Sequence, residues 1–199
     1  MGIAFPASAR EWYAQEGATD ILLSCGVVDE SCPIEQMGEM PERDELNPRP
    51  AAFYDPAMLR FMCDNHGGVV YAIRLDGSAD PPVYTWDDDQ VWIRQGDTFS
   101  RYLFIIVWSG LADQAAFHRA AFSGPLASSD LGLLGEELDE VPPALRDSPV
   151  RRFERDDQRL VIAPFSVATL HWYLSAETAG GMEALVRTVW RRSDMRASP

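Results

Sequence analysis

Hydrophobic and polar residues alternate in several short runs of the chain, and this alternation predicts β-strands that are buried on one face. Glycine, proline, asparagine and aspartate separate the runs, as expected where the chain turns. The predicted strands span residues 69–75, 83–86, 91–94, 150–154, 159–165 and 169–174, with a minor strand at Val27 and Val28.

Apolar residues spaced three and four positions apart predict helices in the first third of the chain. The first helix begins just after Pro6, where Ser8 and Glu11 have the spacing of a capping box. The second begins at Asp55, which would cap it, with Pro56 in the first turn. The apolar contacts of this second helix would come from Met58, Leu59, Phe61 and Met62.

Two further helices are predicted later in the chain. One is capped by Asp97 or Thr98, and its pattern extends through residues 115–122 to a stop at Gly124. Its buried face would consist of Phe99, Tyr102, Leu103, Ile106 and Leu111. The last helix follows Gly180 and Gly181. One face of this helix is lined by Met182, Leu185, Val186, Val189 and Trp190.

Two segments lack a regular pattern. Residues 29–50 mix acidic residues with four prolines and predict a surface loop, and residues 126–143 are rich in glycine and acids and predict a connection. Helices and strands otherwise follow one another, which predicts an α+β fold with a mixed or antiparallel sheet flanked by helices. We expect a domain over residues 1–125, with the strands and helix of residues 126–199 completing the same domain.

The net charge of the chain limits the classes of partner that it can bind. It has 31 acidic and 17 basic residues, all of the basic ones arginine, for a formal net charge of −14. Such acidity repels nucleic acid and anionic membranes, whereas a basic protein would be attracted and would associate faster at low salt. The plainer alternative is that the charge only keeps the protein soluble.

The sequence also indicates a compartment. No apolar run approaches the roughly 18 residues that span a bilayer, and the N-terminus lacks the pattern of a signal peptide. Cys25, Cys32 and Cys63 form an odd set without a disulfide framework, which favours reduced thiols. We therefore expect a cytoplasmic protein, and the use of arginine without lysine indicates a GC-rich bacterial genome.

Candidate chemistry is sparse. No serine lies in a G-x-S-x-G elbow, and the three histidines are scattered. Cys63 and His66 have a C-x-x-H spacing that could supply two zinc ligands, but two further ligands are not evident. The sequence predicts no catalytic, cofactor-binding or metal-binding residue. An undetected hydrolase is the least favoured hypothesis.

Binding to another protein accounts better for the same residues. Trp86 and Trp92 bracket three consecutive aspartates, and aromatic anchors beside charged groups are common in tight interfaces. The alternatives are that both tryptophans pack in the core, or that the acidic loop over residues 29–45 is the contact surface. The predicted partner-binding residues are Asp76, Asp80, Trp86, Asp87, Asp88, Asp89 and Trp92.

Several motifs resemble the SUKH superfamily of bacterial immunity proteins and yeast cell-wall regulators. The early aromatic motif corresponds to Pro6, Trp12 and Tyr13, and the Asn-Gly-Gly-like turn to Asn65, Gly67 and Gly68, interrupted by His66. A D-G-x-x-D-P-P-V motif corresponds to Asp76, Gly77, Asp80, Pro81, Pro82 and Val83. The S-F-x-x-F-L motif corresponds to Phe99, Tyr102 and Leu103. The resemblance covers roughly residues 5–108.

This resemblance implies an α+β domain that acts without catalysis or cofactor. Many members are taken to be immunity proteins that neutralise a cognate toxin, and others are regulatory binding modules. The sequence therefore predicts a protein that neutralises a basic toxin, or alternatively an intracellular regulatory or scaffold module without a toxin partner.

Overall fold

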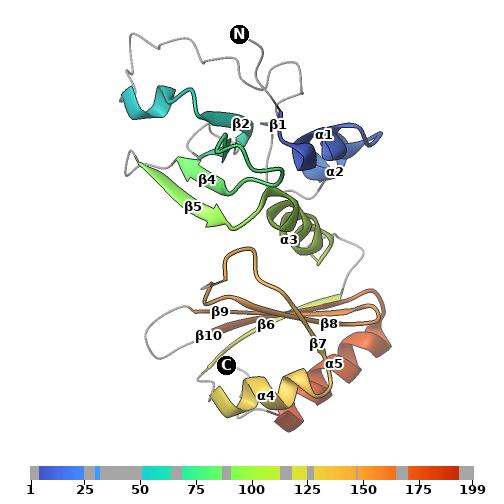
Figure 1. The fold of residues 1–199 in the computed structure, drawn as a ribbon. Coiled ribbons are helices and arrows are strands. Elements are labelled where there is room, and N and C mark those ends of the chain that lie inside the picture. Colours follow the sequence, from blue (N-terminus) through green and yellow to red (C-terminus); the bar gives the residue numbers. More distant parts are fainter. Residues whose placement is uncertain are drawn as a thin grey trace, which may run out of the picture. The chain divides into compact units, whose positions relative to one another are not determined.

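The chain forms two compact units in a computed structural model, and they divide between Leu111 and Ala112. Each unit contains one five-stranded antiparallel sheet and its own helices (Figure 1). This architecture confirms the predicted α+β class. The structure describes residues 5–24, 30–31, 51–63, 69–86, 91–112, 118–124, 128–146, 148–164 and 170–192.

The first unit is a meander of strands with helices at its start and end. Its strands lie in the order β1-β2-β3-β4-β5, so each pairs with the next along the chain. The elements are α1 (Ala7–Tyr13), α2 (Ala18–Ser24), β1 (Glu30–Ser31), the 3₁₀ turn η1 (Ala51–Tyr54), β2 (Met58–Cys63), β3 (Val70–Arg74), β4 (Val83–Trp86), β5 (Trp92–Gly96) and α3 (Phe99–Ala112).

The core of the first unit lies where helices α1, α2 and α3 meet one face of the sheet. Helix α3 contributes Phe99, Leu103 and Ile106, spaced to share one helical face, as predicted. The rings of Phe99 and Phe61 meet edge to face with centroids 5.1 Å apart. Burial of these side chains is what holds the helices to the sheet.

Strand β2 replaces the helix that the sequence predicts after Asp55. A β-bulge shifts the register between Arg60 and Met62, so buried side chains come in pairs separated by one half-buried residue. That spacing imitates a helical period. Asp55 does bind the backbone, but its Oδ1 accepts the N–H of Ala57 at 2.9 Å in a turn and caps no helix.

The capping box predicted at Ser8 is wrong, whereas Thr98 caps α3 as predicted. Pro6 occupies the N-cap position of α1, and Ser8 lies inside the helix with its N–H donated to the carbonyl of Ala79 at 3.0 Å. Proline is favoured at helix starts because it lacks the N–H that would be unsatisfied there. At α3, the N–H of Arg101 points to Oγ1 of Thr98 at 3.4 Å. The minor strand at Val27 and Val28 lies outside the described residues.

The second unit is a separate sheet with helices on one face. Its strand order is β6-β10-β9-β8-β7. Side chains of α4 and α5 meet Trp172, Leu160 and Phe153 of the sheet in one core cluster. The elements are β6 (His118–Gly124), α4 (Ser128–Gly135), β7 (Asp139–Val141), β8 (Arg151–Arg155), β9 (Gln158–Pro164), β10 (Leu170–Ala176) and α5 (Ala179–Arg192).

Two predictions in this half are wrong. Residues 118–124 form strand β6 where a continuing helix was expected, because they pair with all seven residues of β10 and alternate across the sheet. The connection expected over residues 126–143 contains α4 and β7. On α5, the side chain of Trp190 is 51% exposed, and its ring lies against Phe122. The strands after Leu111 form a sheet of their own.

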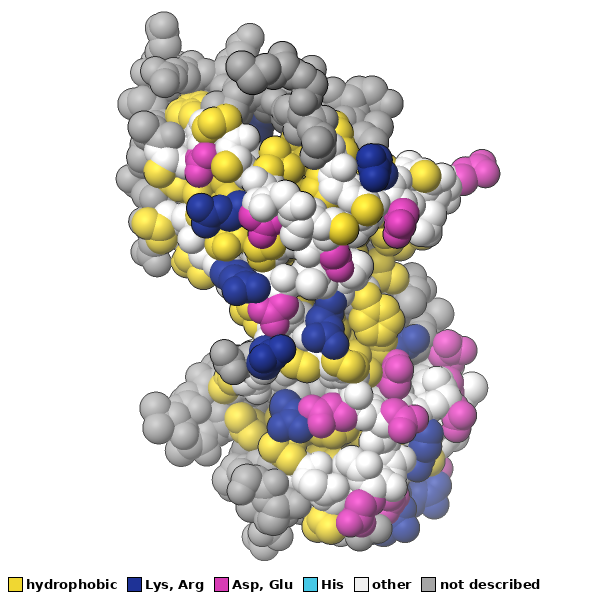
Figure 2. All heavy atoms as spheres, in the orientation of Figure 1, with side chains coloured by type: hydrophobic (Ala, Val, Ile, Leu, Met, Phe, Trp, Pro, Cys, Tyr) yellow, Lys and Arg dark blue, Asp and Glu magenta, His cyan; other side chains and the backbone are white. Residues whose placement is uncertain are grey.

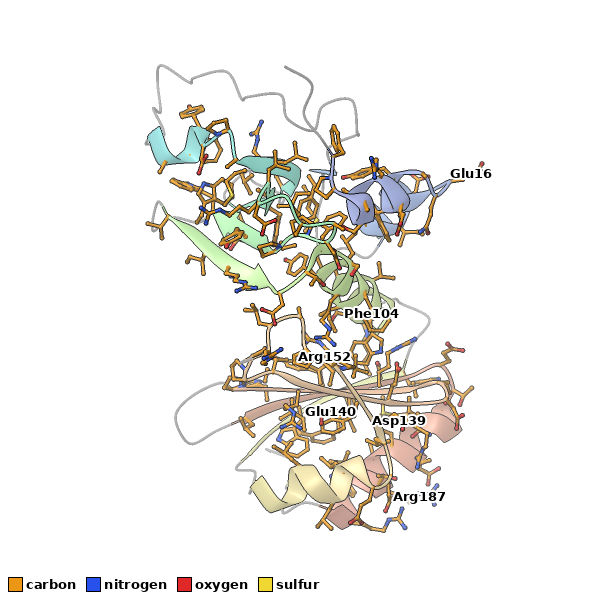
Figure 3. All side chains as sticks on the ribbon, viewed as in Figure 1. Glu16, Phe104, Asp139, Glu140, Arg152 and Arg187 are labelled. Atoms are coloured by element: carbon orange, nitrogen blue, oxygen red, sulfur yellow. The ribbon has the colours of Figure 1, made fainter. Side chains whose placement is uncertain are left out.

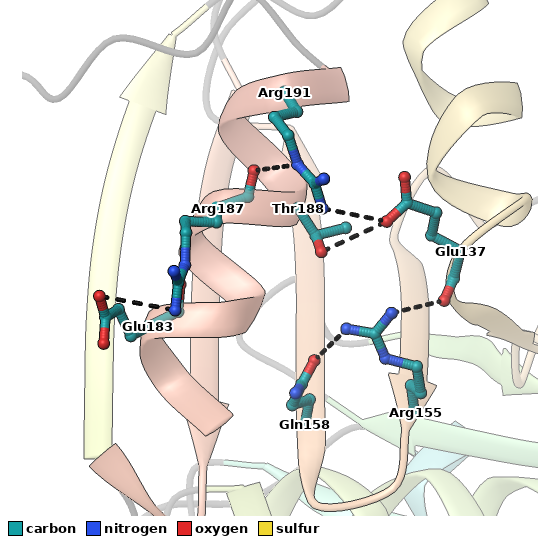
Figure 4. A network of polar contacts seen from close by, with 7 residues as sticks. All are labelled: Glu137, Arg155, Gln158, Glu183, Arg187, Thr188 and Arg191. Carbon is teal, nitrogen blue, oxygen red and sulfur yellow. Dashed lines mark hydrogen bonds and ion pairs between the residues drawn. The ribbon is translucent and has the colours of Figure 1, made fainter. Parts of the chain in front are cut away.

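Polar contacts fasten α5 and α4 to the strands of the second unit. Thr178 caps α5 by accepting the N–H of Gly181 at 3.0 Å, and a side chain at Gly181 would come within 2.7 Å of Asp157. Glu137, just after α4, accepts from Thr188 and pairs with Arg191 of α5 (Figure 4). The hairpin between β8 and β9 turns at Asp156, as the sequence predicts.

No helix in the described part of the chain combines the length and the apolar character needed to cross a bilayer.

Because each unit has its own core, we predict that a core substitution in one unit destabilises that unit alone. Leu160→Ala removes a fully buried side chain of the second unit and should cost that unit about 2–4 kcal/mol in free energy of unfolding. Amide hydrogen exchange should then accelerate in β8, β9 and β10 but stay unchanged in β2–β5. Leu59→Ala in the first unit is the reciprocal control. If either substitution accelerates exchange in both units equally, the two cores are one cooperative whole.

Candidate functional site

The predicted partner-binding residues that the structure describes lie around strand β4. Asp76 and Asp80 precede β4, Trp86 ends it, and Trp92 begins β5. The intervening residues Asp87, Asp88 and Asp89 lie outside the described residues. The candidates therefore divide between the two ends of the β4 strand.

At one end, Trp86 is part of a small aromatic core. Only 2% of its side chain is exposed, and its ring meets Phe53 and Trp92 edge to face, each with centroids 5.3 Å apart. The indole N–H of Trp92 is donated to the carbonyl of Ala52 at 3.0 Å. This cluster fastens η1 to the sheet, so Trp86 cannot anchor a partner without leaving its packed position.

At the other end, Asp76 organises a turn. Its Oδ1 accepts the N–H of Ser78 at 2.9 Å, and Gly77 has a φ of 86°, which favours glycine. The hydrogen bond from the Ser78 backbone lowers the pKa of the Asp76 carboxyl. The carboxylate remains exposed on the surface of the turn.

Asp80 fastens the β3–β4 connection to the start of α3. Its carboxylate accepts the N–H of Ser100 at 3.0 Å and the hydroxyl of Ser100 at 2.6 Å. Partial burial acts to raise the pKa of Asp80, but the hydrogen bonds from Ser100 outweigh it and hold the pKa below its usual value. A carboxylate at the N-terminus of a helix also interacts favourably with the helix dipole.

A shallow polar depression of about 560 Å³ lies beside these two aspartates. Arg94 pairs with Asp97 across it at 3.0 Å, and Arg74 lies next to Asp76 in the same lining. Two arginines and three aspartates thus line the depression. Its carboxylates already hold turns and a helix start, so its chemistry is that of a structural surface.

A second hollow, which the sequence analysis missed, lies between the helices of the first unit. It is an apolar groove of about 310 Å³ that α1, α2 and α3 line together, and we call it the helical groove. Phe104 on α3 is 51% exposed and Ile21 on α2 is 39% exposed (Figure 3). The lining residues are Ser8, Glu11, Trp12, Gln15, Ile21, Phe99, Ser100, Leu103, Phe104 and Val107.

The negative charge of the chain is concentrated in the first unit. Residues 1–111 contain 18 acidic and 7 basic side chains, for a net charge of −11, whereas residues 112–199 contain 13 and 10, for a net charge of −3. On the visible face, hydrophobic side chains reach the surface between the charged ones (Figure 2). The helical groove therefore belongs to the strongly acidic unit.

The metal hypotheses rest largely on residues that the structure does not describe. His66 and the aspartates Asp87, Asp88 and Asp89 lie outside the described residues. Within the described ranges, no three histidine, cysteine, aspartate or glutamate side chains come together in a way that could hold a metal ion.

The hydrogen bonds of Asp80 predict a pH-dependent loss of stability in one variant. Asp80→Asn should lower the free energy of unfolding by about 1 kcal/mol at neutral pH, because it removes the charged cap of α3. Since the folded pKa is lowered, the contribution of Asp80 is complete above its unfolded pKa of about 3.9 and is lost as the pH falls through the folded value.

Urea unfolding at neutral and acidic pH measures this effect. The control is Glu16→Gln, which neutralises an exposed carboxylate after α1 (Figure 3). A destabilisation by Asp80→Asn that persists unchanged at the lowest pH would mean that the carboxylate charge is not responsible.

Comparison with known proteins adds no relative from which a function could be transferred: no family model, no curated protein and no solved structure matches the chain.

Proposed function

We propose that the chain is a non-catalytic protein-binding protein whose first unit binds a basic partner, and that this partner is a toxin that the chain neutralises. The observation that carries the proposal is the unequal charge of the two units, −11 against −3. If acidity served only solubility, there would be no need for it to gather on one unit. Charge of one sign on one surface steers an oppositely charged partner and raises its association rate.

The resemblance to the SUKH superfamily also supports the first unit as the one that binds a partner. It extends over roughly residues 5–108, and the first unit extends to Leu111. The resemblance therefore falls on a unit that has its own sheet and its own core. Immunity proteins are frequent in that superfamily, and a basic toxin domain such as a nuclease suits an acidic inhibitor, since carboxylates can occupy a site meant for phosphate.

Affinity capture from the native host lysate tests the proposal. At about 50 mM salt the full chain should retain one basic, toxin-like protein, and at about 300 mM salt much less of it, because screening weakens the attraction between exposed charges. Mass spectrometry identifies the retained protein. The purified pair should then show loss of the toxic activity when mixed in equal amounts.

The control is a variant chain in which three exposed acids of the second unit are neutralised, Glu136→Gln, Asp139→Asn and Glu177→Gln. Capture should persist with this variant, because the charge of the first unit is unchanged. Salt-insensitive capture of acidic cellular proteins would contradict the toxin proposal and favour a regulatory or scaffold module.

A further inference from the structure

We infer that the helical groove of the first unit is the docking site for an amphipathic helix of a basic partner, with an apolar side chain seated against Phe104 and a cation beside Glu11. The inference rests on the proposed function, and it moves the contact surface away from the β4–β5 turn that the sequence favours. Helix-in-groove recognition needs an apolar trough of helical length with charge at its rim.

The residues that line the helical groove come from one face of α1 and one face of α3. Ser8, Glu11 and Trp12 recur at intervals of three and four residues along α1. Leu103, Phe104 and Val107 repeat this spacing on α3. Apolar side chains in such rows form ridges and grooves into which the side chains of another helix fit.

The groove also holds an unsatisfied donor. The indole Nε1 of Trp12 is buried and has no hydrogen-bond partner among the described residues. An unpaired buried donor is costly, and a ligand that supplies an acceptor removes this cost.

Charge at the rim of the groove gives the docked helix a direction. Glu11 is the charged side chain among the lining residues, and Arg10 lies on the opposite side of α1 because residues one apart do not share a helix face. Arg101 is exposed on α3, three residues before Phe104. A docked helix should therefore place its cations toward α1 and away from Arg101.

Charge complementarity selects this occupant over two others. A second copy of the chain would bring another unit of net charge −11 to an acidic surface. The segment over residues 32–50 carries five acids and two arginines, so its own charge disfavours it beside Glu11. A basic helix from another protein meets neither obstacle.

The test uses a dye-labelled synthetic peptide of about 18 residues, long enough to form helix, with leucines along one face and arginines along one flank. Its Kd for the full chain is measured by fluorescence anisotropy at low salt. Phe104→Ser should raise the Kd about tenfold, as the loss of a central apolar anchor does. Glu11→Arg should raise the Kd several-fold, and Arg101→Glu should lower it.

Each variant has a matched control in the same unit. Val91 is 52% exposed, nearly the same as Phe104, so Val91→Ser removes a comparable apolar surface outside the groove. Glu16→Arg makes the same change of net charge as Glu11→Arg, but at a residue that does not line the groove. Both controls should leave the Kd within about twofold of the wild-type value.

The outcomes separate this inference from the proposed function. Equal effects of Phe104→Ser and Val91→Ser, equal effects of Glu11→Arg and Glu16→Arg, or no binding of the peptide would each overturn the groove as the docking site. If a basic protein is still captured from lysate by the Phe104→Ser and Glu11→Arg variants, the groove inference is wrong while the proposed function stands. Peptide binding that depends on the groove, together with capture of acidic proteins only, overturns the proposed function alone.

Discussion

The packing of α3 against one face of the first sheet is the interaction on which the rest of the first unit depends. Phe99, Leu103 and Ile106 reach the sheet from one side of the helix, and Ala9 and Leu22 bring α1 and α2 to the same core. Because the core takes only one face of α3, the neighbouring face with Phe104 is left at the surface beside α1. The helical groove exists because one face of α3 packs in the core while the neighbouring face stays at the surface.

Asp80 fixes the position of the N-terminal end of α3. By accepting both hydrogen bonds from Ser100, it links the start of the helix to the turn before β4. The carboxylate of Asp80, which the sequence suggested for partner binding, thus has a structural role. Other carboxylates of the first unit, such as those of Glu11, Glu16 and Asp20, are exposed and add to its negative charge.

Local patterns in the sequence predicted the elements whose causes are local. The runs that form strands β3, β4 and β5 are separated by local turn signals such as Gly77, and the β8–β9 hairpin turns at Asp156. Strand β2 was missed because its bulge gives buried residues a helix-like spacing, and β6 because its pairing partner β10 begins 46 residues after β6 ends. Pairing across such a distance leaves no trace in a short window of sequence.

The candidate site was harder to predict for the same reason. The helical groove joins residues 8–15, Ile21 and residues 99–107, which no motif connects. The sequence pattern of Trp86 and Trp92 does not distinguish packing from partner binding, because an aromatic pair beside acids looks the same whether it packs inward or faces a partner. A signal existed in α1, where Ser8, Glu11 and Gln15 continue the face that carries Trp12 and so keep one flank of the helix free of large aliphatic side chains.

The most direct test of the account is hydrogen-exchange mass spectrometry of the full chain with and without its captured partner. The account predicts that binding slows exchange in α1, α2 and α3 and leaves β6–β10 and α5 unchanged. Slower exchange confined to residues 118–192 would contradict it, because the partner would then bind the nearly neutral second unit.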